Sequence, residues 1–323
     1  MSQSKEGRIV VVVAGMHRCG TSVVTRGLLA SGLYLGGKLL PETEEDNPRG
    51  YWEDSSVVTI NSSIMALFGS NELSPHWFTE DELRKAIPES YYTLARNLVS
   101  ERLSHKGLWA FKDPRTALLL PFWQKIFNDL EVDDRYVIAL RNPLDSAASF
   151  CHRNNKDKRN HKVSLSWGSV LWAEHMLSAA YGVQHRKAVV VDYDLLMHDA
   201  KSQIRRITNI LEIPRTQESV QDIDDYATLF VDSALRHFSS DLDNLASSQD
   251  IIPIIKDMYS VLRGHALQER AFSYNDNAVF WNQVYSAFSL LAPAFDGFTA
   301  GLANVRPHWR TRLRMSVLSF LAK

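Results

Sequence analysis

The feature that most constrains this 323-residue chain is a short turn between an apolar run and a helical pattern. The apolar run is Ile9–Ala14, the turn is Gly15–Ser22 (Gly-Met-His-Arg-Cys-Gly-Thr-Ser), and the helical pattern is Thr21–Ser31. A strand that ends in a glycine-bounded loop and leads into a helix directs backbone N–H groups and the positive end of the helix dipole at one point. The turn therefore predicts an anion site, and a nucleotide is the favoured ligand.

The spacing of this turn also fits the phosphate-binding loop G-x-x-x-x-G-K-[ST] of nucleotide triphosphatases, with one departure. Thr21 stands where those proteins carry the lysine that serves the β- and γ-phosphates. The departure favours a ligand other than a nucleoside triphosphate.

The composition excludes several classes of protein. The 36 Lys and Arg residues against 37 Asp and Glu give a formal net charge of −1, so there is no overall basic field for a nucleic acid. Cys19 and Cys151 are too few for a disulfide framework, and the first residues lack the apolar stretch of a signal peptide. No apolar run approaches the roughly 18 residues of a membrane span, and no histidine has metal-ligand spacing. We expect a cytoplasmic protein that holds no metal and binds no nucleic acid.

Four short apolar runs alternate with helical patterns. The runs are apolar on both faces, which is typical of buried parallel strands, and they are Ile9–Ala14, Leu108–Phe111, Tyr136–Leu140 and Ala188–Val191. Helices are predicted at Thr21–Ser31, Val57–Phe68, Pro88 to about Leu103, Thr116–Phe127, Leu144–His152, Ser166–Tyr181 and Ala200–Leu211, and Thr79-x-x-Glu82 forms a capping box that starts another. This alternation predicts an α/β, three-layer, P-loop-like fold with a central parallel sheet.

Two further segments shape the domain prediction. The polar stretch Gly36–Asp54 reads as a long loop over the turn, and loops of that length are more often functional than idle. Beyond about residue 240 only helices are predicted, at Asp241–Leu262, Asn277–Leu291 and Pro307–Ala322. We therefore expect an α/β domain over residues 1–240 and a helical C-terminal region over 241–323, either packed on that domain or appended to it.

Each predicted strand is followed by polar side chains, most of which suit an anion. The first strand is followed by Arg18, the second by Lys112-Asp113-Pro114-Arg115, the third by Arg141-Asn142-Pro143 and the fourth by Asp192-Tyr193-Asp194. Ligands of open parallel sheets bind outside the carboxyl ends of the strands, where these residues gather. Several cations on one rim imply a ligand with more than one phosphate-like group.

The third group has a spacing that points to a single oxyanion. If Leu144–His152 is a helix, Ser149 and Arg153 lie on one face, and Arg141 stands just before the helix starts. The three side chains then converge on one point.

At this point a resemblance becomes specific. Arg141-Asn142-Pro143 with Ser149 resembles the 3′-phosphate motif of sulfotransferases that use 3′-phosphoadenosine 5′-phosphosulfate (PAPS), and Gly15–Ser22 resembles their 5′-phosphosulfate loop. Lys112-Asp113-Pro114 is similar to a triplet of tyrosylprotein sulfotransferases, and Gly50-Tyr51-Trp52-Glu53 resembles bacterial members that mostly modify carbohydrate. The resemblance covers about Arg8 to Phe238.

The resemblance implies roles for individual residues. Arg18, Gly20, Thr21 and Ser22 would hold the 5′-phosphosulfate in the loop that also contains Gly15, His17 and Cys19; Arg141, Ser149 and Arg153 would hold the 3′-phosphate; and Tyr193 and Arg236 would line the nucleotide pocket. Lys112 and Arg18 would stabilise the negative charge that grows on the leaving phosphate, and Glu53 would be the general base, with the adjacent Asp54 left as an alternative. Cys19 replaces the usual loop serine, although its backbone N–H remains available to an anion.

Alternatives remain open on the sequence alone. The chain is interpreted as a sulfotransferase with a saccharide acceptor; a P-loop kinase or a non-catalytic nucleotide-binding scaffold are the rival functions. Cys19 at a helix start is either reactive or a small loop residue, Tyr193 either contacts the ligand or packs, and Trp52, Trp77 and Trp123 either stack on a sugar or fill the core. The basic C-terminal helix either docks on the protein or rests on a membrane surface. The oligomeric state stays open.

Overall fold

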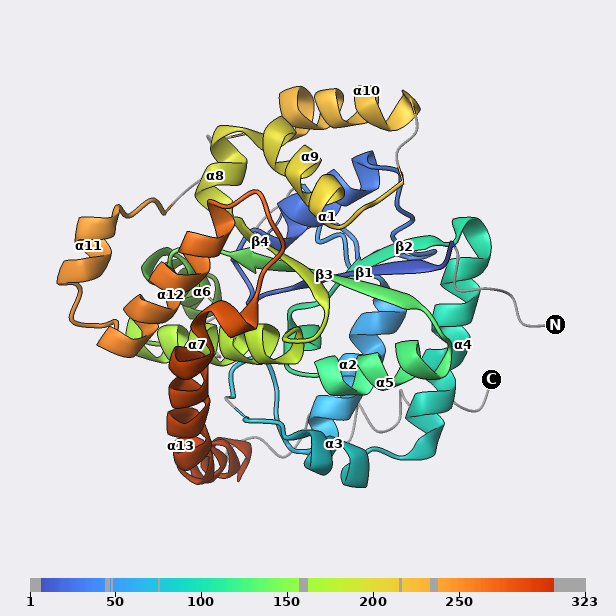
Figure 1. Cartoon of the computed structure of the whole chain (residues 1–323). Helices are drawn as coiled ribbons and strands as arrows, with labels where there is room; N and C mark the ends of the chain where they lie inside the picture. The colour runs from blue at the N-terminus through green and yellow to red at the C-terminus, as the bar shows by residue number, and fades with distance from the viewer. Residues whose placement is uncertain are drawn as a thin grey trace.

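A four-stranded parallel sheet forms the centre of the molecule (Figure 1). The structure is a computed structural model, and it describes residues 7–43, 47, 49–74, 76–156, 162–214, 217–232 and 238–304. The strands are β1 (Ile9–Ala14), β2 (Leu108–Lys112), β3 (Asp133–Leu140) and β4 (Lys187–Asp192), in the order β2-β1-β3-β4. The predicted α/β class and its four strands are confirmed; β3 begins three residues before the predicted Tyr136.

Alternate residues of the strands feed two separate cores. Val10 and Val12 of β1 belong to one buried cluster, and Val11 and Val13 belong to the other. Successive side chains of a strand point to opposite faces, and a sheet that is covered on both faces has apolar residues at every position. This arrangement explains why the strands read as continuous apolar runs.

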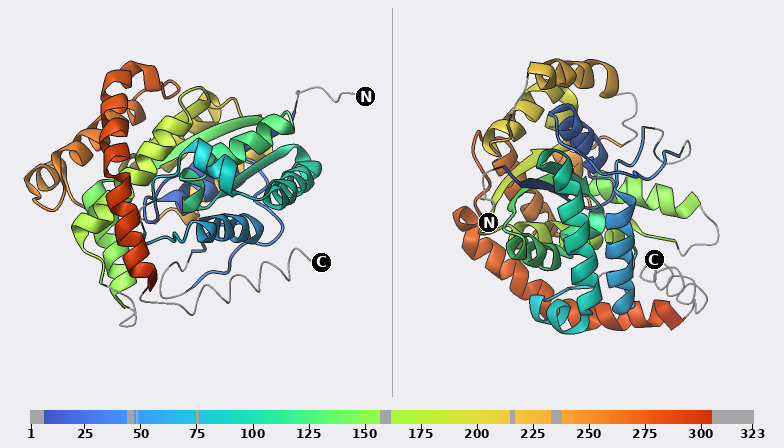
Figure 2. Two further views of the ribbon diagram at one scale, coloured as in Figure 1. Left: turned by 90° about the horizontal axis from the view of Figure 1, so that it is seen from below. Right: turned by 90° about the vertical axis from the view of Figure 1, so that its right-hand side faces the viewer.

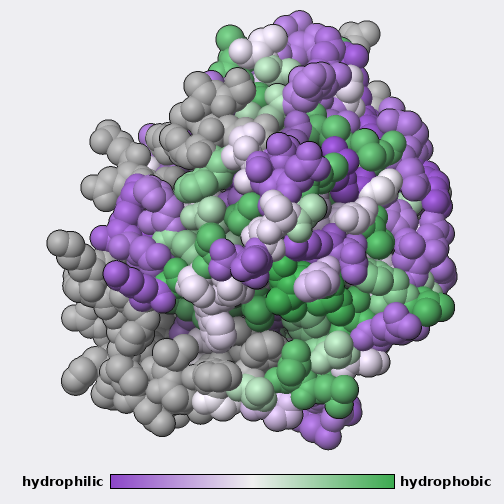
Figure 3. Space-filling view, turned by 90° about the vertical axis from the view of Figure 1, so that its left-hand side faces the viewer, coloured by the Kyte–Doolittle hydropathy of each residue, from purple (hydrophilic) through white to green (hydrophobic). Residues whose placement is uncertain are grey.

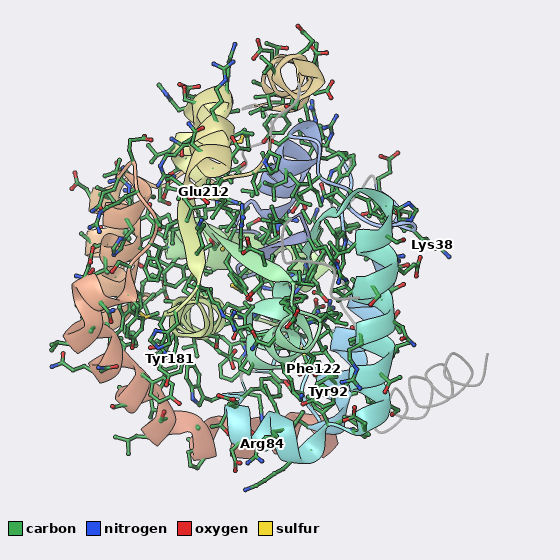
Figure 4. The ribbon with its side chains drawn as sticks, turned by 45° about the vertical axis from the view of Figure 1, so that its right-hand side comes forward. Lys38, Arg84, Tyr92, Phe122, Tyr181 and Glu212 are labelled. Carbon is green, nitrogen blue, oxygen red and sulfur yellow. The ribbon has the colours of Figure 1, made fainter. Side chains whose placement is uncertain are left out.

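Helices cover both faces of the sheet, as the right-hand view of Figure 2 shows. One face carries α1 (Thr21–Ala30), α9 (Ala200–Ile210), α10 (Gln217–Asp225) and the π-helical turn η2 (Tyr226–Phe230). The other face carries α2 (Ser55–Leu67), α3 (Glu80–Ala86), α4 (Glu89–Lys106), η1 (Pro114–Ala117), α5 (Leu120–Asp129), α6 (Pro143–Lys156) and α7 (Leu165–Gly182). In Figure 4 the rings of Tyr92 on α4 and Phe122 on α5 lie close together, with centroids 4.9 Å apart. The short α8 (Tyr193–His198) follows β4 directly.

The helical C-terminal region differs from the prediction. The expected single helix Asp241–Leu262 is wrong, because the structure has α11 (Leu242–Ser247) and then α12 (Pro253–Ala266). Proline suits the first turn of a helix and interrupts its interior, so Pro253 starts a new helix. After η4 (Tyr274–Asn277), α13 (Ala278–Asn304) extends beyond the predicted Leu291. The predicted helix Pro307–Ala322 lies outside the described residues.

The C-terminal helices share the larger of the two cores. Met258 of α12 and Trp281 of α13 are fully buried in the cluster that contains Val10 and Val12. The Phe272 N–H also donates to the Ala188 carbonyl of β4 at 2.8 Å. Phe288 is the last described residue of the chain that is buried in this core. The division of the chain into two regions at residue 240 stays a prediction.

The outer surface mixes hydrophilic and hydrophobic side chains. On the face toward α11, hydrophobic side chains gather from the middle to the lower right of the view, and hydrophilic ones lie mainly above them (Figure 3). Among the helices of the described residues, none combines the length and the apolarity needed to span a bilayer.

Candidate functional site

One cavity of about 350 Å³ lies at the carboxyl ends of the four strands. The structure brings most of the predicted site residues to its lining: His17, Arg18, Gly20, Thr21, Ser22, Glu53, Lys112, Arg141, Ser149, Arg153 and Tyr193. Gly15 and Cys19 belong to the same turn but do not line the cavity, and Arg236 lies outside the described residues. Residues that are far apart in the sequence therefore meet where the resemblance implies a nucleotide pocket.

The turn after β1 requires glycine at both of its ends. A Cβ atom on Gly15 would stand 2.7 Å from the Ala139 carbonyl oxygen of β3, and a Cβ on Gly20 would overlap the Tyr193 ring. Gly20 also has a φ of 79°, in the left-handed region that glycine adopts without strain. It begins α1 with no side-chain cap, and the residues of the first helical turn, whose N–H groups have no intrahelical partner, line the cavity.

Cys19 is part of the packing beneath the turn. It is 1% exposed, its Sγ lies 3.4 Å from Ser146 Oγ, and burial raises the pKa of its thiol to about 11. The reactive-thiol alternative is therefore wrong. The expectation that its backbone N–H serves an anion is also wrong, because that N–H donates to the Met16 carbonyl at 3.2 Å.

Arg141 is a buried cation that has only neutral partners. It is 7% exposed and donates to the carbonyls of Arg18 at 3.0 Å and Phe238 at 2.7 Å. Its Nε is buried and makes no hydrogen bond. No carboxylate of the described residues lies within ion-pair distance of it. A buried charge without a counter-ion is costly, so this guanidinium is placed to receive an anion.

Tyr193 serves as a platform for this arginine. The Arg141 guanidinium lies 4.6 Å from the centre of the Tyr193 ring, and the ring also packs against Gly20. Cations above aromatic faces are attracted by the ring quadrupole. In the structure Tyr193 packs against Arg141 and Gly20, and it also lines the cavity.

Ser149 joins the same group, whereas Arg153 lines the same cavity but pairs with another residue. Ser149 Oγ accepts a hydrogen bond from Arg18 Nε at 2.9 Å, and Arg141 bonds to the Arg18 carbonyl. Arg153 lies instead 3.5 Å from a carboxylate oxygen of Glu72. Arg141 and Ser149 therefore meet as predicted, since both bond to Arg18. Arg153 does not join them, because it pairs with Glu72.

Lys112 and Glu53 form a buried ion pair at the cavity wall. Their side chains are only 4% and 8% exposed, and Lys112 Nζ donates to Glu53 Oε1. Burial, together with the nearby Asp113 charge, raises the pKa of the Glu53 carboxyl, and the Lys112 ammonium opposes this shift. A buried carboxylate with a raised pKa is suited to accept a proton.

Asp54 is not an alternative base. It is fully buried, receives Arg102 Nε at 2.6 Å, and caps α2 by accepting the Ser56 N–H at 2.9 Å. It does not line the cavity. Of the two adjacent acids, only Glu53 lines the cavity.

The long loop Gly36–Asp54 reaches the turn, as expected, and Asn47 and Arg49, which the sequence did not single out, take part in these contacts. Asn47 Nδ2 donates to Ser22 Oγ at 3.3 Å, and Ser22 Oγ donates to the Tyr51 carbonyl at 3.2 Å. Arg49 pairs with Asp232 at 3.1 Å and donates to the Phe230 carbonyl. The only sequence signal for these contacts was the length of the loop.

The three tryptophans do not form one stacking surface. Trp77 and Trp123 are buried in the larger core, where Trp123 Nε1 donates to Asn61 Oδ1 at 2.9 Å. Trp52 packs edge-on against Phe230, with ring centroids 6.0 Å apart. The sugar-stacking interpretation of this set is wrong, and packing explains it.

Two buried histidines near the cavity predict a loss of stability in acid. Burial lowers the pKa of His17 well below 6.5 and that of His175 to about 4. Because the unfolded chain binds protons below pH 6.5 and the folded chain does not, the free energy of unfolding falls as the pH drops from 6.5 toward 4. For His175 alone the expected loss is about 3 kcal/mol.

Urea denaturation at several pH values measures this loss. His175→Gln is expected to flatten the decline, and the exposed His198→Gln serves as the control. An equally steep decline in His175→Gln would contradict the assignment.

The chain is similar to members of a known protein family. A family model described as "Sulfotransferase family" matches residues 11–218. Among solved structures, a sulfotransferase domain from the curacin biosynthetic pathway is 14% identical over 88% of this chain and 97% of that domain, with a TM-score of 0.39. A sulfotransferase domain from the Synechococcus PCC 7002 olefin synthase is 15% identical over 89% and 97%, with a TM-score of 0.35. No curated protein matches. The described residues contain no group of three His, Cys, Asp or Glu placed to hold a metal ion.

Proposed function

Since the chain belongs to the sulfotransferase family, we propose that it moves a sulfuryl group from PAPS to a hydroxyl or amine of a saccharide. The observation that carries the choice of donor is Arg141, a buried guanidinium with neutral partners beside the phosphate-binding turn. A second phosphate on the ribose supplies the missing counter-ion. The turn residues Thr21 and Ser22, with the first N–H groups of α1, then receive the 5′-phosphosulfate.

In the proposed reaction the acceptor oxygen attacks sulfur in line with the leaving phosphate. The new bond joins the acceptor oxygen to sulfur, and the bond that breaks joins sulfur to the bridging oxygen of the donor. Glu53 takes the proton of the acceptor hydroxyl, and the electron pair of the broken bond remains on the leaving phosphate beside Lys112 and Arg18. The products are the sulfate ester and adenosine 3′,5′-bisphosphate. Positioning and fixed charge supply most of the catalysis in such transfers.

The rival functions fit the cavity less well. A kinase of the P-loop type needs a lysine at position 21, where this chain has Thr21. A nucleotide-binding scaffold has no use for the buried Lys112–Glu53 pair, which is costly to keep unless it serves a reaction. The saccharide acceptor rests on the resemblance of Gly50-Tyr51-Trp52-Glu53 to carbohydrate-modifying members. Transfer of labelled sulfate to a panel of glycans tests it.

Nucleotide-dependent stabilisation tests the choice of donor. Adenosine 3′,5′-bisphosphate at a hundred times its Kd, without magnesium, is expected to add about 2.7 kcal/mol of stability. Differential scanning fluorimetry detects this as a higher Tm. The matched control is adenosine 5′-monophosphate, which lacks the 3′-phosphate and is expected to give a much smaller shift. A larger response to ATP with magnesium than to the bisphosphate would support a kinase instead.

A further inference from the structure

A cluster of basic side chains at one end of the cavity has no part in the steps above. The Glu72 carboxylate lies 3.4 Å from His17 Nε2, 3.8 Å from an Arg115 nitrogen and 3.5 Å from an Arg153 nitrogen. All four residues line the cavity, and they come from the turn after β1, the segment before α3, η1 and α6. Arg115 also pairs with Asp113 at 2.9 Å. The fold therefore gathers three basic groups from separate segments around the Glu72 carboxylate.

The pairing within this cluster is loose. Well-formed bonds between a cationic N–H and a carboxylate measure about 2.7–2.9 Å, and all three distances to Glu72 are longer. His17 Nε2 is buried and makes no hydrogen bond, despite its distance to Glu72. The Glu72 side chain is 34% exposed, more than Arg115 at 18% or Arg153 at 20%. The carboxylate is thus the most exposed member of the site, and it leaves His17 Nε2 without a hydrogen bond and Arg153 with only a long contact.

The cluster acts electrostatically on Lys112 and Glu53, the pair to which the proposed reaction assigns the transfer. Arg115 is three residues after Lys112, and its charge lowers the pKa of Glu53. The charge of Lys112 in turn acts on His17. A group bound between His17, Arg115 and Arg153 would lie next to the base that receives the acceptor's proton.

We infer that His17, Arg115 and Arg153 bind an oxyanion carried by the acceptor, and that the Glu72 carboxylate fills this site until the acceptor displaces it. The inference rests on the proposed function and names the class of its substrate: a molecule with a carboxylate, phosphate or sulfate near the hydroxyl or amine that is modified. A neutral histidine N–H and two guanidinium groups provide donors for several oxygens of such a group.

Glu72→Gln is the variant that tests this inference, because it removes the charge and keeps the size. The matched control is Asp81→Asn, whose carboxylate also pairs with two basic residues, Arg84 and Lys85, on the exposed α3. Inorganic sulfate is titrated by calorimetry into each protein saturated with adenosine 3′,5′-bisphosphate, with chloride keeping the ionic strength constant. Glu72→Gln is expected to bind one sulfate about tenfold more tightly than the wild type and Asp81→Asn, because a tethered carboxylate no longer competes.

A second variant separates the acceptor site from the donor site. Adding Arg115→Gln to Glu72→Gln is expected to abolish sulfate binding while the Kd for the bisphosphate stays unchanged. Sulfate that binds only by displacing the bisphosphate would assign the cluster to the donor and overturn the inference. Equal sulfate binding by Glu72→Gln and Asp81→Asn would overturn it too. If the bisphosphate binds no variant, the proposed function fails, whereas the sulfate titration without nucleotide still reports on the cluster.

Discussion

Arg141→Ala is expected to weaken the binding of adenosine 3′,5′-bisphosphate about a hundredfold or more. Removing one partner of a buried, hydrogen-bonded charge pair costs about 2–5 kcal/mol, and each 1.4 kcal/mol is about a factor of ten in Kd. Arg141 has carbonyls as its partners within the protein, so nothing nearby replaces its charge. Isothermal titration calorimetry measures the effect directly.

Arg135 provides the control for this experiment. It lies on β3, the strand that Arg141 follows, and is 7% exposed like Arg141. Its partners, the Asp133 carboxylate and the Glu212 carbonyl, lie at the opposite end of the sheet. Arg135→Ala is expected to lower stability and to leave the Kd of the bisphosphate unchanged. An Arg141→Ala protein that binds the bisphosphate as tightly as the wild type would refute the 3′-phosphate assignment.

The second large effect is expected at the Lys112–Glu53 pair. Lys112→Ala should reduce kcat by about 10²–10³ through the loss of fixed positive charge, and Glu53→Gln should reduce it by about 10²–10⁴ through the loss of a base. Both variants should keep most of their affinity for the bisphosphate. Either change leaves a buried charge unpaired and lowers stability, so turnover is expressed per bisphosphate-binding site.

The pH dependence identifies the base more sharply than the rate alone. Burial raises the pKa of Glu53 above 4.5, and only its deprotonated form accepts a proton, so the rate should rise with pH through a value above 4.5. Glu53→Gln should lose this rise. Asp54→Asn is the control next to it in the sequence and should keep the rise, because Asp54 is bound to Arg102 away from the cavity. If Asp54→Asn loses the rise and Glu53→Gln keeps it, the assignment is reversed.

The sequence predicted best what short-range patterns determine. Strands such as Ile9–Ala14 are buried on both faces, so every position is apolar and the run is easy to recognise. The turn after it was recognised from the spacing of its glycines. The structure explains this spacing, because β3 and Tyr193 approach the backbone at Gly15 and Gly20. Parallel strands place their carboxyl ends together, and this rule alone brought Arg18, Lys112 and Arg141 to one cavity.

Contacts between distant loops were beyond the reach of such patterns. Nothing in the sequence pairs Arg49 with Asp232 or Glu72 with Arg153, because each pair depends on the paths of two irregular segments. Helical spacing placed Arg153 on the same face as Ser149, but the direction of a long side chain is decided by the nearest acid. The break at Pro253 was visible in the sequence and was not used.

The sheet order has a consequence for how a ligand acts on the whole protein. The strands β2, β1, β3 and β4 are parallel, so each connection leaves the carboxyl end of one strand and crosses a face of the sheet before the next strand begins. Lys112 ends β2, whereas Arg18, Arg141 and Tyr193 follow β1, β3 and β4, and all four line one cavity. A molecule that is bound by all four residues stabilises the four strands together, although the chain connects these strands only through long crossovers.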